Sequence, residues 1–431
     1  SYKICIYSVW VLVDNATPIH QRGTMEASEV KHADLKKGQL RNLLVATFAS
    51  IFAYWAWSVI SPLAKFYSSP EQMHLDEGGS SLLIAMPVLV GAVGRIPAGA
   101  LTDKYGGRVM LTAVMALSAP LTLLVALAGS MKSFGLMLVF SFLLGIAGTV
   151  FAVGIPFSAA WYGASKKGFA TGIYGVSTVG TAVSAFVTPI LHRQLGYWPT
   201  HILLAALCLV MAAVCFTVLR DSPQFTRSTE PIIPKLLAAS RVKETWQLCF
   251  LYSIFFGAFV AFSNYLPTFL TNVYEKNLIE AGMRASGFAV AAVAARPLGG
   301  ILADRVGPRL VTLIGMGGTV ALGASVALQP EGEHVYGPLF LTMAVLLGLG
   351  CGSVFGWVGR AIPADKVGIA SGIIGAAGGL GGFFPPLVMG ATYNAAANSY
   401  FNGLMLLALT AAVGVGMTLI VRGGKKSLDA P

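Results

Sequence analysis

Two stretches of the chain repeat one pattern: RIPAGALTDKYGGR at residues 95–108 and RPLGGILADRVGPR at residues 296–309. Both arginines, the acid and a glycine recur at a constant offset of 201 residues. A second pair, GFATGIYG at residues 168–175 and GIASGIIG at residues 368–375, is offset by 200 residues. Two independent matches at nearly the same offset predict a duplicated chain, with two halves in the same orientation.

The composition places this duplication in a membrane protein. Of the 431 residues, 55% are hydrophobic and 11% are charged, whereas soluble domains are roughly 25% charged. Too little polar surface remains for a soluble enzyme or a nucleic-acid-binding protein. The net charge of +11 reflects scarce acids, 18 Asp and Glu against 29 Lys and Arg, and does not come from a basic patch.

Apolar segments of about 18–25 residues recur along the chain. We expect twelve spans at residues 42–66, 80–102, 109–130, 134–156, 169–192, 200–219, 246–269, 281–303, 310–328, 337–358, 368–390 and 398–421. The predicted fold class is therefore an all-α polytopic membrane protein. Its predicted parts are a tail at 1–41, a six-helix half at 42–219, a linker at 220–245, a second half at 246–421 and a tail at 422–431.

The basic residues predict the orientation of these spans. The tails and the loops after even-numbered spans hold 22 of the 29 Lys and Arg, and the opposite loops hold five. By the positive-inside rule, both tails and the linker are cytoplasmic. We expect residues 1–41 to be poorly ordered. Met25 opens a typical cytoplasmic lead-in, so residues 1–24 could be an upstream extension.

The two remaining basic residues, Arg95 and Arg296, fall within spans. Arg95 lies eight residues before Asp103, which begins a loop, or about 12 Å along a helix. This depth is close to the middle of a hydrocarbon core about 30 Å thick. Arg296 has the same spacing from Asp304. We expect both arginines to face the bundle interior or a water-filled cavity, and to approach each other across the two halves.

Neither arginine has a carboxylate partner in the predicted membrane interior, because all 18 acids fall in tails, loops or span ends. A structural arginine paired within the protein is the alternative to a binding site. Backbone carbonyls can help to compensate two buried guanidinium groups, but a bound anion is the natural partner. The planar fork of arginine favours a planar oxyanion. The sequence therefore predicts an anion site at Arg95 and Arg296.

The pattern Gly-x-x-x-Asp-x-x-Gly-x-Arg at residues 99–108 and 300–309 resembles the cytoplasmic signature of the major facilitator superfamily. The resemblance implies the major facilitator fold. We expect Asp103, Arg108, Asp304 and Arg309 to lie at helix ends and to gate the inward face. Their expected role is conformational, without contact to the substrate.

Residues 368–386, GIASGIIGAAGGLGGFFPP, resemble the eleventh-helix signature of the nitrate/nitrite porter family, the NarK-type transporters. Arg95 and Arg296 match the substrate-binding arginines of that family, and Tyr252 and Phe256 match its helix-seven pair that flanks the anion. The resemblance covers residues 42–421. It implies a monomeric transporter of nitrate and nitrite in the inner (plasma) membrane, used in nitrate assimilation, with no cofactor, metal or nucleic-acid partner.

Helix five departs from that family. Many members have Gly-x-Gly-Asn-x-Gly, whose Asn contacts the anion, where this chain has GVSTVG at residues 175–180. Ser177, Thr178 or Thr181 could supply a hydroxyl group instead. Which of the three faces inward is not determined by the sequence.

Glycines and aromatic residues supply further candidates. Gly175 and Gly379 belong to glycine runs, which serve either to pack helices closely or to expose backbone along a cavity. Aromatic residues crowd the first span, and one or two of them could line the site: Phe52, Tyr54, Trp55 and Trp57.

The expected mechanism is alternating access, by rocking of the two halves about an anion site at mid-membrane. Two unpaired arginines should resist closure of an empty site, which favours nitrate/nitrite exchange. One alternative to exchange is proton-coupled or net nitrate uptake, through Tyr252 or water.

A second alternative is an antiporter for another small anion, such as a carboxylate. An anion sensor that does not transport is a third, disfavoured by loops shorter than about 30 residues. No motif indicates an enzyme.

Overall fold

The computed structural model describes residues 19–162, 167–223, 225, 227, 232–363 and 366–421. Twelve of the described helical segments are long and apolar enough to cross a membrane, which confirms the predicted number of spans. The rest of the predicted tails, residues 1–18 and 422–431, lies outside the described residues. The same is true of residues 224, 226 and 228–231 in the predicted linker.

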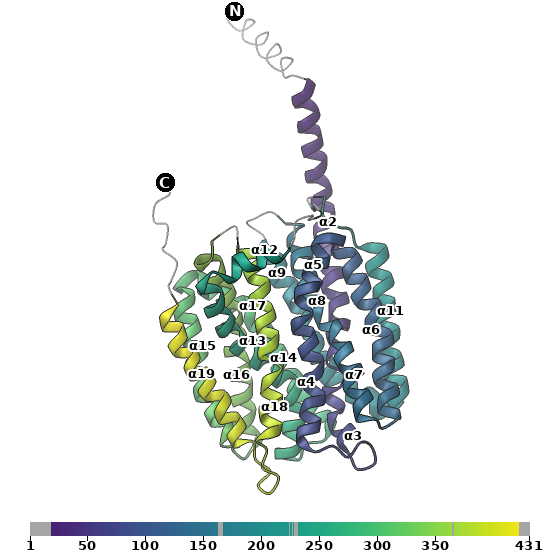
Figure 1. Cartoon of the computed structure of the whole chain (residues 1–431), viewed down its shortest axis with the longest axis vertical. Helices are drawn as coiled ribbons and strands as arrows, with labels where there is room; N and C mark the ends of the chain where they lie inside the picture. The colour runs from purple at the N-terminus through teal and green to yellow at the C-terminus, as the bar shows by residue number, and fades with distance from the viewer. Residues whose placement is uncertain are drawn as a thin grey trace, which may run out of the picture.

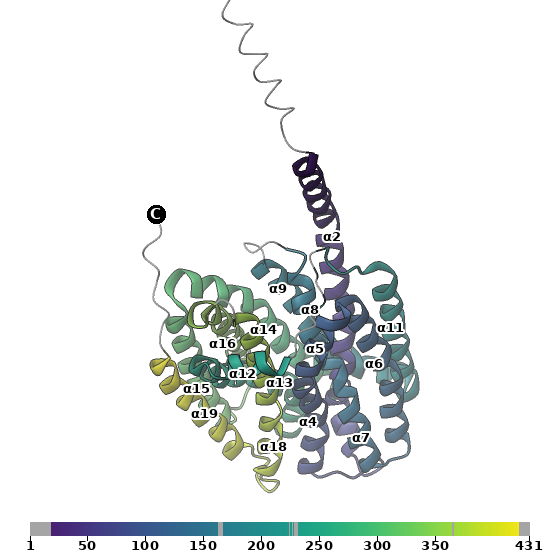
Figure 2. The same cartoon turned by 45° about the horizontal axis from the view of Figure 1, so that its top comes forward.

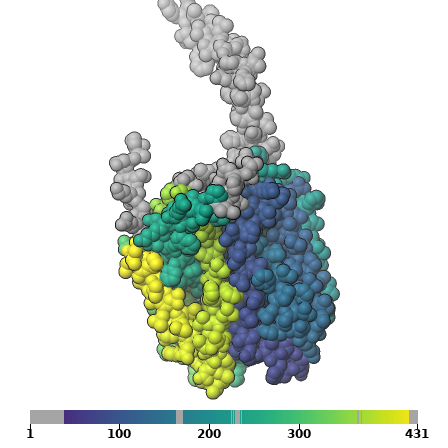
Figure 3. All heavy atoms as spheres, viewed as in Figure 1, coloured from purple at the N-terminus to yellow at the C-terminus, as the bar shows by residue number. Residues whose placement is uncertain are grey.

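Two groups of six spans lie side by side, the first coloured purple to blue-green and the second green to yellow (Figures 1 and 3). The N-terminal half consists of α2 (Ile19–Trp57) with η1 (Ser61–Leu63) and α3 (Ala64–Ser68); α4 (Glu77–Val93) with α5 (Arg95–Tyr105); α6 (Gly107–Ser130); α7 (Phe134–Leu144) with η2 (Gly145–Thr149) and α8 (Val150–Ala159); α9 (Lys167–Gly175) with η4 (Val176–Val179) and α10 (Gly180–Leu195); and α11 (Tyr197–Val218).

The short helix α12 (Ile232–Ser240) precedes the second half and packs against α13 and α17. The C-terminal half consists of α13 (Lys243–Tyr274), α14 (Leu278–Val306), α15 (Pro308–Ala327), α16 (Glu333–Ala361), α17 (Val367–Gly381) with α18 (Phe384–Ala391), and α19 (Phe401–Ile420). The helix α2 begins, and α19 ends, at the same end of the bundle, which we call the terminal end (Figures 1 and 2). The opposite end is called the far end.

The first helix begins earlier than the predicted span. The helix α2 starts at Ile19 and continues without a break into the span expected from residue 42, and the poor order expected for residues 1–41 stays a prediction. No proline interrupts residues 19–57, and residues 25–37 are mostly good helix formers such as Ala, Glu, Lys and Leu. The helix therefore extends beyond the bundle at the terminal end (Figure 1).

Four spans of the N-terminal half change their helical geometry along their length. The helix α4 gives way to α5 at Gly94, and 3-10 turns interrupt the other three spans at η1, η2 and η4. Such turns within a helix often mark a hinge or a site of strain. Arg95 begins a new helix after one of these breaks, whereas Arg296 lies inside the continuous helix α14. The two arginines are therefore equivalent in the sequence repeat, but the backbone around them differs between the two halves.

The far end is closed by polar contacts between the two halves. The carboxylate of Glu77, at the start of α4, accepts hydrogen bonds from Asn272 Nδ2, from the Tyr400 hydroxyl at 3.0 Å and from the Tyr265 hydroxyl at 3.2 Å. Lys65 Nζ of α3 donates to Asn272 Oδ1 at 2.7 Å. One carboxylate of the N-terminal half thus holds three residues of the C-terminal half.

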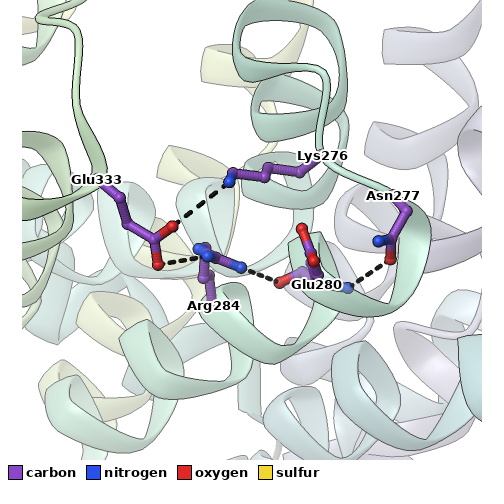
Figure 4. A network of polar contacts seen from close by, with 5 residues as sticks. All are labelled: Lys276, Asn277, Glu280, Arg284 and Glu333. Atoms are coloured by element: carbon purple, nitrogen blue, oxygen red, sulfur yellow. Dashed lines mark hydrogen bonds and ion pairs between the residues drawn. The ribbon is translucent and has the colours of Figure 1, made fainter.

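A second carboxylate at the far end has its described partners within one half. Glu333, at the start of α16, forms ion pairs with Arg284 and, at 3.4 Å, with Lys276, and all three belong to the C-terminal half (Figure 4). Nearby, Asn277 caps α14 by accepting a hydrogen bond from the Glu280 backbone N–H at 3.0 Å. Glu333 therefore serves as a matched control for Glu77.

We expect Glu77→Ala to open the far end. Ser61, which is buried in η1 and bonds to the carbonyl oxygen of Asn264 in the other half, supplies the reporter position. In a Ser61→Cys variant whose native cysteines have been replaced, a water-soluble maleimide should react about tenfold faster after Glu77→Ala. The reason is that a hydrogen bond to a charged group contributes roughly 1.5–3 kcal/mol.

Glu333→Ala should leave the maleimide rate of the Ser61→Cys protein unchanged. Equal acceleration by both alanine substitutions would show that loss of any far-end carboxylate loosens the bundle, and would refute the specific role of Glu77.

Candidate anion-binding site

Arg95 and Arg296 each reach into the opposite half of the protein. Arg95, at the start of α5, is 4% exposed and donates from Nη1 to the backbone carbonyl of Gly375 in α17, at 2.7 Å. Arg296, partly buried in α14, donates from Nη1 to Thr178 Oγ1 in η4, at 3.3 Å. The two arginines therefore cross the interface between the halves in opposite directions.

One aromatic ring is shared by both guanidinium groups. The Cζ atoms of Arg95 and Arg296 lie 5.3 and 5.1 Å from the ring centre of Phe256 in α13. Arg95 also lies 5.1 Å from the ring of Phe151, and Arg296 lies 4.3 Å from the ring of Phe259. Each such cation–π contact contributes roughly 0.5–2 kcal/mol, which offsets only part of the cost of burying a full charge.

The two arginines keep unused hydrogen-bond donors. Within the described part of the chain, Arg95 Nε and both Nε and Nη2 of Arg296 are buried without a partner. No ion pair between described residues involves either arginine. Unpaired buried donors of a cation are costly, so the arrangement suits a small acceptor with negative charge.

Tyr252 supports this centre from the C-terminal half. Its ring stacks on Phe256, with the ring centres 5.2 Å apart and the planes 15° apart, and meets Phe355 edge-on. A Cβ atom at Gly378 would lie 2.4 Å from the Tyr252 ring, so this glycine makes room for the stack. Tyr252 and Phe256 thus lie beside the arginines, as their spacing on one helix predicts.

The hydroxyl groups of helix five have different roles. Thr178 Oγ1 accepts from Arg296 and donates its proton to the Gly175 carbonyl at 2.9 Å. Thr181 Oγ1 donates to the carbonyl of Thr178 at 2.9 Å, which satisfies it within its own helix. Ser177 is fully buried, and its hydroxyl has no partner among the described residues. Thr178 therefore holds an arginine and has no proton left to donate to an anion.

The glycines divide into two groups. A Cβ atom at Gly175 or Gly375 would have no atom within 4 Å, although Gly375 is buried. These two positions therefore border open space beside the arginines. A Cβ atom at Gly379 would lie 2.7 Å from that of Ala92 and 3.4 Å from Arg95 Nη1, and one at Gly381 would lie 2.1 Å from the Ser253 carbonyl oxygen. Gly379 and Gly381 thus permit close packing between helices.

The four predicted gating residues lie at the terminal end. Arg360 donates to Asp304 Oδ1 at 3.1 Å, Arg309 donates to the Leu419 carbonyl, and Arg108 donates to the Phe216 carbonyl. Each of these contacts stays within one half. Asp103 lies on an exposed face of α5. These contacts brace the ends of helices, and the gating role of the four residues stays a prediction.

Three contributors were missed by the sequence analysis: Phe151, Phe259 and the Gly375 carbonyl. Phe259 follows Phe256 by three residues and so shares its helix face, a spacing that could have revealed it. Phe151 has no equivalent aromatic residue one repeat later. Within the described residues, no cluster of His, Cys, Asp and Glu could hold a metal ion.

The chain is similar to known membrane transporters. Residues 46–386 match the family model of the Major Facilitator Superfamily. The chain is 50% identical over 384 residues, 89% of this chain and 97% of the relative, to "Probable nitrate/nitrite transporter NarK2" of Mycobacterium tuberculosis (strain ATCC 25618 / H37Rv). It is 32% identical over 369 residues, 85% of this chain and 90% of the relative, to "Nitrite extrusion protein" of Bacillus subtilis (strain 168).

A solved structure shares the fold. The bacterial homologue of the human lysosomal transporter Spinster, in an inward-facing and occupied conformation, aligns with a TM-score of 0.67 and covers 88% of this chain and 96% of its own. Its sequence identity of 15% restricts this likeness to the fold.

We expect two alanine substitutions in α17 to have opposite effects on stability. Gly375→Ala adds a methyl group in open space and should raise the free energy of unfolding, because alanine in a helix is favoured over glycine by roughly 0.5–1 kcal/mol. Gly381→Ala forces a methyl group against the Ser253 backbone and should lower it. Thermal unfolding of both purified variants in detergent checks the signs. A lower melting temperature for Gly375→Ala would contradict the open space at that position.

Proposed function

The chain belongs to the Major Facilitator Superfamily and, within it, to the nitrate/nitrite porters of the NarK type, and on this basis we propose that it carries nitrate and nitrite across the membrane by alternating access. It is a transporter and not an enzyme. The anion is held between Arg95 and Arg296, beside Phe256 and Tyr252. The observation that carries this proposal is the pair of crossed arginines whose free donors have no carboxylate partner among the described residues.

Nitrate fits these donors because it is planar, singly charged and rich in lone pairs. A guanidinium fork binds such an ion through parallel hydrogen bonds. Each arginine is anchored by one Nη1 atom in the opposite half, so its other donors remain for the ion. The aromatic rings around them give a dry surrounding in which these charged hydrogen bonds are strong.

We infer that transport is an obligatory exchange of nitrate and nitrite. The Cζ atoms of the two arginines lie 5.3 and 5.1 Å from one ring centre, so their separation cannot exceed the sum of these distances. Without an anion, the two guanidinium groups therefore repel each other by roughly 2 kcal/mol or more at an effective dielectric constant of 20. The return of the empty carrier requires the halves to close around these charges. A bound anion of either kind removes the repulsion and permits the return step.

The basic residues support an orientation with the terminal end in the cytoplasm of a bacterial cell, because the positive-inside rule applies to its loops and tails. The far end then faces outward, and its closure by Glu77 corresponds to an inward-facing state. In this proposal the cytoplasmic side is gated by Asp103, Arg108, Asp304 and Arg309.

The protein acts as a monomer in the plasma membrane, since each monomer of this fold contains a complete site between its halves.

Obligatory exchange predicts that nitrate uptake into vesicles depends on an anion inside the vesicles. Purified protein in liposomes loaded with nitrite should take up external nitrate, and protein in empty liposomes should not. Uptake is followed with a nitrate electrode or with isotopically labelled nitrate. Equal uptake into empty vesicles would refute exchange and indicate net or proton-coupled transport. No nitrate movement in either case would refute the choice of substrate, and small carboxylates would be tested next.

Arg95→Lys and Arg296→Lys should each weaken nitrate binding about 10- to 100-fold. Lysine keeps the charge but lacks the fork that binds both the opposite half and the anion, and a charged hydrogen bond contributes roughly 1.5–3 kcal/mol. Isothermal titration calorimetry measures the dissociation constants. Arg193→Lys, at an exposed position of α10, is the control and should bind like the wild type. Full affinity in either lysine variant would place the anion elsewhere.

A further inference from the structure

Tyr54 of α2 carries a buried hydroxyl group without a partner. Its side chain is 1% exposed, and its hydroxyl makes no hydrogen bond within the described residues. Two other fully buried tyrosines are paired: Tyr174 bonds to Ser50 and to the Val150 carbonyl, and Tyr400 bonds to Glu77 and Asn272. The buried hydroxyl of Tyr336, at the start of α16, is unpaired among the described residues but lies at the far end, away from the arginines. Buried hydroxyl groups are usually paired, so an unpaired one in a binding protein points to a ligand.

The position of Tyr54 places it at the site described above. Its Cβ atom would lie 2.7 Å from a Cβ atom at Gly180, the residue that follows η4. The helix α2 therefore packs directly against the segment that carries Thr178. The hydroxyl of Tyr54 also lies within electrostatic range of both Arg95 and Arg296. Tyr54 thus lies on α2 beside the segment whose Thr178 anchors Arg296.

The inventory of donors leaves a role for this hydroxyl. Thr178 uses its proton on the Gly175 carbonyl and its lone pair on Arg296, so it cannot donate to a bound anion. The other unpaired atoms around the centre, among the described residues, are the free N–H groups of the two arginines and the hydroxyl of Ser177. The hydroxyl of Tyr54 is a neutral donor that can serve an oxygen atom which neither arginine reaches.

We propose that the Tyr54 hydroxyl donates a hydrogen bond to the bound anion and favours nitrate over nitrite; this inference rests on the proposed function. Two arginines from opposite halves serve two oxygen atoms of the anion. A third donor finds a free oxygen atom on nitrate, which has three, whereas nitrite offers it only the nitrogen lone pair or an oxygen atom that already accepts from an arginine. Tyr54 is in this way a specificity-determining residue.

The test compares nitrate and nitrite binding in the purified full chain by calorimetry. Tyr54→Phe should raise the dissociation constant for nitrate about tenfold and that for nitrite less than twofold. Its melting temperature should not fall, because the removed hydroxyl has no protein partner. Tyr174→Phe is the matched control: it removes an equally buried but paired hydroxyl, so it should lower the melting temperature and leave both dissociation constants unchanged.

Three results would overturn the inference. Unchanged nitrate binding in Tyr54→Phe would remove the hydroxyl from the site, and equal weakening of both anions would refute its role in selectivity. A loss of nitrate selectivity in Ser177→Ala, with none in Tyr54→Phe, would assign the third donor to Ser177. If the wild-type protein bound neither anion, the proposed function itself would fail, and this result is distinct from the other three because it appears before any substitution is made.

Discussion

Two buried guanidinium groups without a described carboxylate partner are the constraint on which the rest of this structure depends. Arg95 and Arg296 lie deep in a bundle whose interior disfavours isolated charge. The protein compensates them with a backbone carbonyl, a threonine hydroxyl and three phenylalanine rings. These groups are all neutral, so the net positive charge of the site remains available to an anion. A paired carboxylate would have removed it.

The crossed arrangement of the arginines links binding to the relative position of the halves. Arg95 is anchored on Gly375 and Arg296 on Thr178, so a rocking movement that separates the halves must break or redirect both contacts. Interrupted spans contribute to the site from both halves: Arg95 follows the break at Gly94, Thr178 lies in the 3-10 turn η4, and Gly375 lies in α17, which ends at Gly381 before α18 begins. We infer that the interrupted spans adapt their backbone while the continuous helix α14 acts as the rigid partner.

Much of this could be predicted from the sequence because it depends on local or periodic signals. The twelve spans follow from apolar length, and the depth of the arginines follows from their spacing to Asp103 and Asp304. The partners of the arginines could not be predicted in the same way. Gly375 is 280 residues from Arg95, and Thr178 is 118 residues from Arg296, so neither contact leaves a pattern in one segment. The roles of Thr178 and Thr181 also depended on hydrogen bonds to their own helix, which the sequence alone left open.

In the exchange that we propose, the strictness of coupling depends on how well the empty site is compensated. A repulsion of roughly 2 kcal/mol would slow the return of the empty carrier about 30-fold, which is a bias and not an absolute block. Each neutral contact that spreads the charge of an arginine lowers this penalty, and Phe256 does so for both arginines at once. The rings that would give the proposed nitrate site a dry surrounding would therefore also make the empty protein easier to close. Because the Glu77 contacts at the far end involve neither arginine, they hold that end closed in the same way with or without an anion. The dependence on a bound anion must then arise at the arginines themselves.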